Sequence, residues 1–263
     1  MKLLAFFNIK GGVGKTTSAI NIAYNLATLH NKKVLLIDVD PQGNASFFFG
    51  CENNQYILED LLRGFKTKPD KNQEHISAKK VIVKTKYKNL DFIPTRNSLW
   101  TFEKELLLSD GKQQFKLRDA LRSVIDDYDF IIVDCTNVVG SLINLNVFAI
   151  ADYVFVPMKD EAWAIQGLEL TKEVLREMYD YNTKLKLGGC FYCGWENRKV
   201  SLTSFMHTEN KKDNKLIKVK IRKNKSIPEM SYVREPLLIY DKKGKATQDY
   251  IELTNEILKI VGG

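Results

Sequence analysis

Residues 8–17, Asn8-Ile9-Lys10-Gly11-Gly12-Val13-Gly14-Lys15-Thr16-Thr17, constrain the fold of this chain more than any other stretch. The apolar run Leu3–Phe7 precedes them and an amphipathic stretch follows, so the order is strand, Gly-rich turn, helix. Glycines let the backbone curl so that successive N–H groups point inward, and a helix start adds positive partial charge. The sequence therefore predicts a phosphate-binding loop at Lys10–Thr17.

Two side chains of this loop have expected tasks. Lys15 would reach the β- and γ-phosphates of a nucleotide, and the Thr16 hydroxyl would bind Mg²⁺. The loop departs from the pattern G-x-x-x-x-G-K-[ST] at one position, because Ile9 stands where the first glycine is expected. A second lysine, Lys10, precedes the glycines instead.

Apolar strands alternate with helical patterns along the rest of the chain. Uninterrupted apolar strands between helices are typical of a parallel sheet that is covered on both faces. We therefore expect an α/β fold with a mostly parallel central sheet, and residues 1–263 as a single domain. The expected strands are Leu3–Asn8, Lys33–Asp38, Leu90–Pro94, Phe130–Asp134, Tyr153–Pro157 and Leu187–Trp195. The expected helices after the first are Tyr56–Arg63, Ser98–Leu108, Gln113–Asp126, Ser141–Ile150, Ala162–Tyr179 and Lys245–Ile260.

Acidic residues end two of the predicted strands. Asp134 follows a fully apolar strand, in the position where a Walker-B carboxylate holds Mg²⁺, usually through water. Asp38 ends another strand and could support the metal indirectly. Asp40 would project to the same side as Asp38 if that strand continues.

The net charge of +8 is unevenly distributed. Arg63–Lys88 carries nine basic and two acidic residues, and Glu196–Lys225 carries ten basic and three acidic, so each stretch is +7. A polyanion is the natural partner of such stretches, and the alternative is a lysine-rich surface that only favours solubility. The candidate contacts to such a partner, for which the resemblance described below implies double-stranded DNA, are Arg198, Lys218, Lys220, Arg222, Lys223 and Lys225.

Hydropathy and cysteine usage bear on location. The apolar start is too short for a signal peptide, and no stretch reaches the roughly 18 apolar residues of a membrane span. The four cysteines are scattered, as suits a reducing cytosol. Cys190 and Cys193 have CxxC spacing but lie in an expected strand, where residues three apart point to opposite faces. His30, His75 and His207 have no partner at ligand spacing.

Several motifs together resemble the ParA/Soj family of DNA-partition ATPases. They are Lys10–Thr17, Val34–Asn44 with its Asp-x-Asp-Pro-Gln-Gly-Asn motif, Asp129–Asp134, Ala151–Gly167 and Arg222–Asp241. The K-G-G-x-G-K-T-T loop is similar to the deviant Walker A loop of the ParA/MinD class of P-loop ATPases. The resemblance covers nearly the whole chain and thins at about Phe65–Lys88 and Ser201–Lys220.

This resemblance implies a P-loop ATPase that uses ATP and Mg²⁺ and turns over slowly. It implies that Lys10 reaches the nucleotide of a second subunit in an ATP-dependent homodimer, and that Asp40 orients the attacking water. It also implies non-specific DNA binding, a ParB-type centromere-binding partner, and a cytoplasmic, nucleoid-associated protein that segregates plasmid or chromosomal DNA.

Departures from the family pattern and two alternative functions remain. Cys135-Thr136-Asn137 replaces a small residue and two prolines, Gln166 replaces an acidic residue, and Arg222-Lys223-Asn224 replaces Pro-Arg-Asn. One alternative is a MinD-like ATPase that positions another cargo or cycles on a membrane. We expect no stable membrane anchor, because Tyr250–Val261 carries two glutamates against one lysine. The other is an iron–sulfur scaffold or nitrogenase-like reductase, which the placement of the cysteines disfavours.

Overall fold

A computed structural model describes residues 1–262 apart from residues 64–75, 110, 112 and 162. Part of the basic stretch Arg63–Lys88, His75 and the expected helix start at Ala162 lie outside the described residues.

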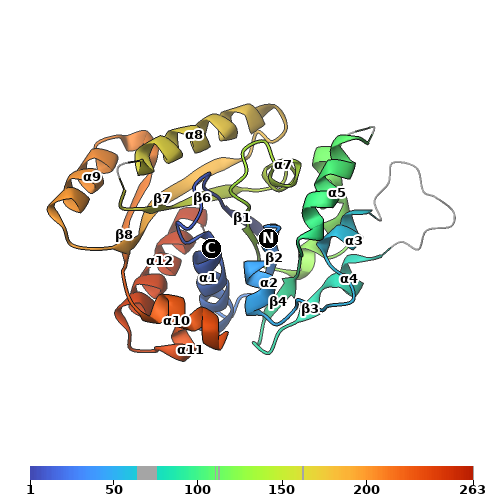
Figure 1. The fold of residues 1–263 in the computed structure, drawn as a ribbon, viewed down its shortest axis with the longest axis horizontal. Coiled ribbons are helices and arrows are strands. Elements are labelled where there is room, and N and C mark those ends of the chain that lie inside the picture. Colours follow the sequence, from blue (N-terminus) through green and yellow to red (C-terminus); the bar gives the residue numbers. More distant parts are fainter. Residues whose placement is uncertain (64–75, 110, 112, 162, 263) are drawn as a thin grey trace.

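Within the described residues, eight strands form one sheet in the order β3-β4-β2-β5-β1-β6-β7-β8 (Figure 1). Neighbouring strands pair in parallel, except that β3 runs antiparallel to β4. The predicted mostly parallel sheet is confirmed. The strands are β1 (Lys2–Phe6), β2 (Val34–Asp38), β3 (Val83–Lys84), β4 (Leu90–Ile93), β5 (Phe130–Asp134), β6 (Tyr153–Lys159), β7 (Lys186–Trp195) and β8 (Leu216–Arg222).

Helices cover both faces of the sheet (Figure 1). The helices are α1 (Lys15–Leu29), α2 (Asn44–Phe48), α3 (Leu58–Arg63), α4 (Ala78–Val81), α5 (Ser98–Leu107), α6 (Lys116–Leu121), α7 (Leu142–Phe148), α8 (Ala164–Glu177), α9 (Lys199–Glu209), α10 (Ser226–Val233), α11 (Leu237–Tyr240) and α12 (Lys245–Val261). Short 3₁₀ turns lie at Gln113–Phe115, Ile125–Asp127, Met178–Asp180 and Lys212–Asn214.

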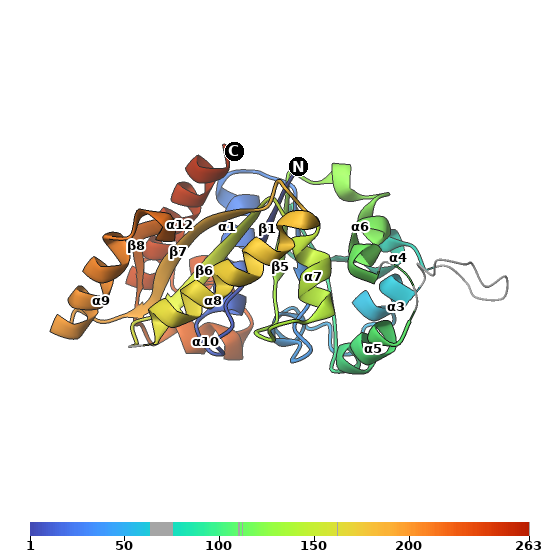
Figure 2. The ribbon, with the colours of Figure 1, turned by 90° about the horizontal axis from the view of Figure 1, so that it is seen from above.

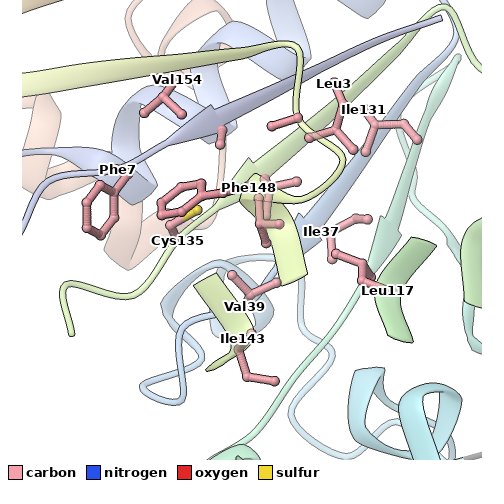
Figure 3. Packing of buried hydrophobic residues seen from close by; sticks show 14 of the residues in the cluster. Leu3, Phe7, Ile37, Val39, Leu117, Ile131, Cys135, Ile143, Phe148 and Val154 are labelled. Carbon is pink, nitrogen blue, oxygen red and sulfur yellow. The ribbon is translucent and has the colours of Figure 1, made fainter. Parts of the chain in front are cut away.

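Two hydrophobic cores lie on opposite faces of the sheet. Successive strand residues point to opposite faces, so Leu3 and Ala5 enter one core while Leu4 and Phe6 enter the other. The first core includes residues of α3 to α8, with α8 lying over β6 and β7 (Figure 2), and the second includes residues of α1, α2 and α10 to α12. In the first core the ring of Phe148 packs edge-on against Phe7, with centroids 5.1 Å apart (Figure 3). The inner strands β1, β2, β5 and β6 are therefore buried on both sides, which explains their apolar sequences, whereas the outer strand β8 alternates buried and exposed residues.

The central strand β1 positions the phosphate-binding loop. It pairs with β5 on one side, where Phe6 lies opposite Asp134, and with β6 on the other. The loop after β1 therefore leaves the sheet between the carboxyl ends of β5 and β6. Crevices at this edge of open α/β sheets are where ligands bind.

The predicted helix Gln113–Asp126 is wrong in extent. A 3₁₀ turn precedes α6, which ends at Leu121, and a second 3₁₀ turn follows at Ile125–Asp127. The N–H of Val124 bonds to the carbonyl of Leu121, an i to i+3 bond that ends the regular helix. This turn buries the β-branched side chain of Val124 in the first core.

The cysteine spacing has the predicted structural meaning. Cys190 and Cys193 both lie in β7, and Cys190 belongs to the first core while Cys193 belongs to the second. Both are buried and free. Because their thiols face opposite sides of the sheet, they cannot bind one metal cluster together.

Gly188 provides a test of this packing. A Cβ atom at Gly188 would lie 2.6 Å from the ring of Phe155, which is buried in the second core. Gly188→Ala should therefore lower the free energy of unfolding by about 1–3 kcal/mol, measured by denaturant titration. Phe155→Leu in the same chain should make the added cost of the alanine smaller. Equal stability of wild type and Gly188→Ala would contradict this packing.

Candidate nucleotide-binding site

Hydrogen bonds to β6 hold the start of the phosphate-binding loop. The N–H of Phe7 donates to the carbonyl of Phe155 at 3.0 Å. The side-chain amide of the buried Asn8 donates to the carbonyl of Pro157 at 2.8 Å. The other end of the Asn8 amide, its oxygen, accepts the N–H of Lys10 at 3.0 Å. The loop therefore starts from a fixed point beside β6.

Two glycines set the path of the loop. Gly12 and Gly14 have φ of 68° and 97°, which is backbone that glycine adopts at little cost. A Cβ atom at Gly14 would also lie 3.2 Å from the Cys193 thiol sulfur. Gly14 is therefore required both by its backbone conformation and by the closeness of β7.

The loop ends at an uncapped helix N-terminus. α1 begins at Lys15, no side chain accepts its first N–H groups, and its first turn contains no acidic residue. Free N–H groups and positive partial charge at a helix start form a ready anion site. The Lys15 ammonium lies 3.4 Å from the carbonyl of Lys10, so it folds back over the loop.

A cavity of about 830 Å³ lies against this helix start. The predicted residues Gly11–Thr17 and Asp40 line it, as does Lys223. Lys10, Asp38 and Asp134 do not line the cavity, and neither do the other DNA candidates. The rest of the lining comes from α1 and α2, from the ends of the neighbouring strands, and from α10 and α12. These residues are Ile20, Gln42, Asn44, Phe47, Phe48, Asn137, Lys159, Cys193, Gly194, Ile221, Asn224, Ile227, Pro228, Met230, Ser231, Tyr232 and Tyr250.

Asp134 is a buried carboxylate, and neither of its oxygens makes a hydrogen bond of regular geometry in the part of the chain that the structure describes. Burial and the neighbouring charge of Asp38 raise the pKa of Asp134 well above its ordinary value, and the nearby Thr16 hydroxyl and Lys15 offset only part of this. A buried carboxylate next to the loop, with the Thr16 hydroxyl beside it, fits a divalent cation, because hard cations prefer oxygen ligands. The hydroxyl of Thr16, on the first turn of α1, is the second oxygen donor from the chain.

Asp38 is satisfied by the protein itself. Its carboxylate accepts the N–H and the hydroxyl of Ser46, both at 2.8 Å, and the N–H of Asp40 at 3.1 Å. Burial raises its pKa to about 7, although these hydrogen bonds lower it. Asp38 therefore holds the start of α2 in place, and any support it gives a metal is indirect.

Asp40 lies beyond the end of β2. The strand ends at Asp38, and the turn that follows closes with a bond from the N–H of Gly43 to the carbonyl of Asp40. One oxygen of Asp40 accepts the N–H of Gln42 at 3.0 Å. This turn, rather than a continued strand, places Asp40 at the cavity while Asp38 is buried behind it.

Sequence reasoning missed Lys159 as a site residue. A Cβ atom at Gly12 would lie 3.8 Å from the Lys159 ammonium, which places this lysine against the loop. Its signal was available, because Lys159 ends the strand next to β1. Asn137 lies similarly close to Gly11, at 3.6 Å from the position of a Cβ atom there. It belongs to the segment Cys135–Asn137, where the sequence departs from the family pattern.

Three of the six DNA candidates, Lys218, Lys220 and Arg222, lie on β8, the last strand of the sheet. Lys218 pairs with Glu209 at 2.6 Å, Lys223 with Glu196 at 3.0 Å, and Arg198 with Asp160 at 3.3 Å. The ammonium of Lys220 lies 3.6 Å from the ring centre of Phe205 and 4.4 Å from that of Trp195.

Arg222 is held more firmly than the other DNA candidates. Its guanidinium and its backbone N–H both bind the buried carboxylate of Asp249. Lys225 is exposed.

A glycine-rich loop between a central parallel strand and an uncapped helix defines the class of P-loop nucleotide-binding proteins. A family model described as an AAA domain matches residues 1–187. The chromosome-partitioning ATPase Soj of Treponema pallidum is 34% identical over 98% of this chain and 97% of its own. The chromosome partitioning protein ParA of Myxococcus xanthus is 32% identical over 98% and 88%. The crystal structure of a plasmid partition protein from Borrelia burgdorferi bound to AMPPNP has a TM-score of 0.77, with 25% identity over 99% and 98%.

The chain belongs to the ParA/Soj family of partitioning ATPases. This confirms the family resemblance inferred from the motifs.

The raised pKa of Asp134 leads to a prediction about stability. The folded state keeps a proton on Asp134 at pH values where the unfolded chain has released it, so the unfolding free energy falls as pH rises above about 4. Asp134→Asn cannot ionise at this position and should show a smaller fall. Melting temperatures of the metal-free and nucleotide-free protein, measured from about pH 5 to about pH 8, compare the two. Parallel curves for the two proteins would contradict the burial of an ionisable carboxylate.

Proposed function

We propose that this chain binds ATP and Mg²⁺ in the cavity, pairs with a second copy when ATP is bound, and hydrolyses ATP slowly. In the ATP-bound pair it would bind double-stranded DNA non-specifically and act in DNA partition with a ParB-type partner, as a cytoplasmic, nucleoid-associated protein. The observation that carries the proposal is the buried carboxylate of Asp134, which has no hydrogen bond of regular geometry within the described residues and lies near the Thr16 hydroxyl at an uncapped helix N-terminus. Such a carboxylate is costly unless a cation completes it.

The residues of the loop would divide the work of binding. The N–H groups of Gly11–Thr17 and the Lys15 ammonium would hold the phosphates, and Thr16 and Asp134 would hold Mg²⁺. Mg²⁺ supplies charge neutralisation at the phosphate oxygens. Asp40, at the cavity wall, would orient the attacking water, because its carboxylate has one oxygen that is not used by the turn.

Lys10 would act on a second subunit. It does not line the cavity of its own chain, although it belongs to the same loop as Lys15. A lysine placed beside the cavity, outside it, can serve the phosphates of a facing copy as an arginine finger does. ATP would then hold the two subunits together, and hydrolysis would release them.

The membrane alternative has less support. The apolar residues of α12, among them Leu253, Ile257 and Val261, are packed in the second core. A helix cannot bury the same face in the protein and in a bilayer. Among the described residues, no helix is long and apolar enough to cross a membrane.

Two substitutions separate pairing from hydrolysis. Asp40→Ala should keep ATP and accumulate as the dimer, because only the water loses its partner. Lys10→Ala should stay monomeric with ATP, because the cation serving the facing phosphates is gone. The solution mass with ATP and with ADP, and phosphate release, compare both variants with wild type and with a control, Lys32→Ala. If the solution mass of the wild type is the same with ATP and with ADP, ATP-dependent pairing is refuted. If wild type and Asp40→Ala hydrolyse ATP at the same rate, Asp40 does not orient the attacking water.

The DNA surface can be refined from the ion pairs. The ion pairs of Lys218 and Lys223 are exposed and therefore weak, so these two lysines can exchange their partners for phosphates, whereas Arg198 pairs with the buried carboxylate of Asp160. Arg222 is better explained as a structural residue, because Asp249 also binds its backbone N–H. The surface also includes exposed lysines between α11 and the start of α12, namely Lys242, Lys243 and Lys245. They lie close to β8, because the Arg222 guanidinium donates to the carbonyl of Lys245 at 3.3 Å.

A matched pair of triple variants tests this surface. Lys218, Lys223 and Lys225 changed together to Gln should weaken binding of a random duplex by the ATP-bound protein. The slope of log affinity against log salt should become shallower by about 2–3, because each lost phosphate contact removes roughly 0.9. The control removes the same charge at the amino ends of β2 and β7, as the exposed Lys33, Lys184 and Lys186 changed to Gln. If the two triple variants weaken DNA binding equally, or if the affinity for DNA does not depend on ATP and on salt, the proposed DNA surface is contradicted. The net positive charge of the chain would then be a sufficient explanation.

A further inference from the structure

The side chain of Lys10 follows a defined path over the first turn of α8. At Gly167 a Cβ atom would lie 3.5 and 3.7 Å from Cγ and Cδ of Lys10, so the missing side chain of Gly167 leaves room for the lysine stem. The Lys10 ammonium lies 5.9 Å from the ring centre of Trp163, within cation–π range. Trp163 immediately precedes α8, and 64% of its surface is exposed.

The indole ring is an unusual partner for a cation at this position. In the part of the chain that the structure describes, no ion pair of Lys10 is found. Gln166, next to Gly167, carries no charge. A carboxylate would neutralise Lys10 and bring a negative charge toward phosphates. An indole face orients the ammonium and leaves its full charge available.

We propose that Trp163 is the positioning residue of Lys10. It holds the ammonium beside the indole ring, outside the cavity of its own chain, from where the lysine would reach a second copy. A free lysine loses rotamer freedom when it is fixed at an interface, and fixing it beforehand reduces that loss. The role of this contact in pairing rests on the proposed function, while the contact itself does not.

The size of the effect follows from the interaction. A cation–π contact at an exposed site changes an equilibrium about two- to fivefold. A symmetric pair contains two copies of Lys10, so the factor applies twice. Loss of the ring should therefore weaken ATP-dependent pairing by about four- to 25-fold, without changing ATP affinity in the unpaired subunit.

The first experiment tests the contact in the nucleotide-free protein. The chain has three tryptophans, so Trp100→Phe with Trp195→Phe leaves Trp163 as the sole reporter of fluorescence. Lys10→Met in that background should change the emission of Trp163. If the double variant does not fold, the chain labelled with 5-fluorotryptophan gives the same answer by ¹⁹F NMR, with the Trp163 signal assigned by Trp163→Phe. If neither the emission nor the ¹⁹F resonance of Trp163 changes in Lys10→Met, the proposal is overturned.

The second experiment tests the role in pairing. Trp163→Leu should weaken ATP-dependent dimerisation, Trp163→Phe should retain most of it, and Trp100→Leu, at another exposed tryptophan, should have no effect. If Leu and Phe are equivalent, or if Trp163→Leu dimerises as tightly as wild type, Trp163 does not position Lys10. If wild type itself does not pair with ATP, the proposed function fails, and the fluorescence result still decides whether the contact exists.

Discussion

The start of α1 is the constraint on which the rest of the structure depends. A helix N-terminus without a capping side chain leaves N–H groups exposed at the end of the central strand. This arrangement needs a strand buried on both faces, a turn with two glycines at positive φ, and a neighbour, β6, that holds Asn8. The parallel sheet then brings the ends of β2, β5, β6, β7 and β8 to the same edge. An anion site is thus a consequence of the fold.

Two buried aspartates next to this site, Asp38 and Asp134, differ in how the protein satisfies their carboxylates. The three donors around Asp38 are all from the chain, so Asp38 shapes the turn that carries Asp40 to the cavity. Asp134, its neighbour across the β2–β5 ladder, has only the nearby Thr16 hydroxyl and no hydrogen bond of regular geometry in the described residues. The same residue type therefore has a structural role on one strand and an open ligand position on the next. Positive charge from Lys15 and from a bound cation would balance the negative charge of Asp134.

The strands around the site could be predicted closely from the sequence, because a strand that is covered by helices on both faces has apolar residues at successive positions. Phe130–Asp134 is the expected strand with identical bounds. The helix over Gln113–Asp126 was overextended, since apolar spacing does not reveal the i to i+3 bonds that end α6. Lys159 was missed because the predicted strand stopped at Pro157, so the lysine was not recognised as the end of β6, beside the loop. Likewise, the partners of the β8 cations come from α9 and α12, which no local pattern on β8 reveals.

The affinity of the purified chain for ATP with Mg²⁺, measured by calorimetry on wild type and Lys15→Ala, tests the central claim most directly. Lys15 lies at the helix start beside the cavity, and its side chain is not part of either hydrophobic core. The account predicts that the affinity falls by more than about tenfold while circular dichroism and the melting temperature of the nucleotide-free protein stay the same. An unchanged affinity in Lys15→Ala would contradict the assignment of the loop and of the cavity it lines.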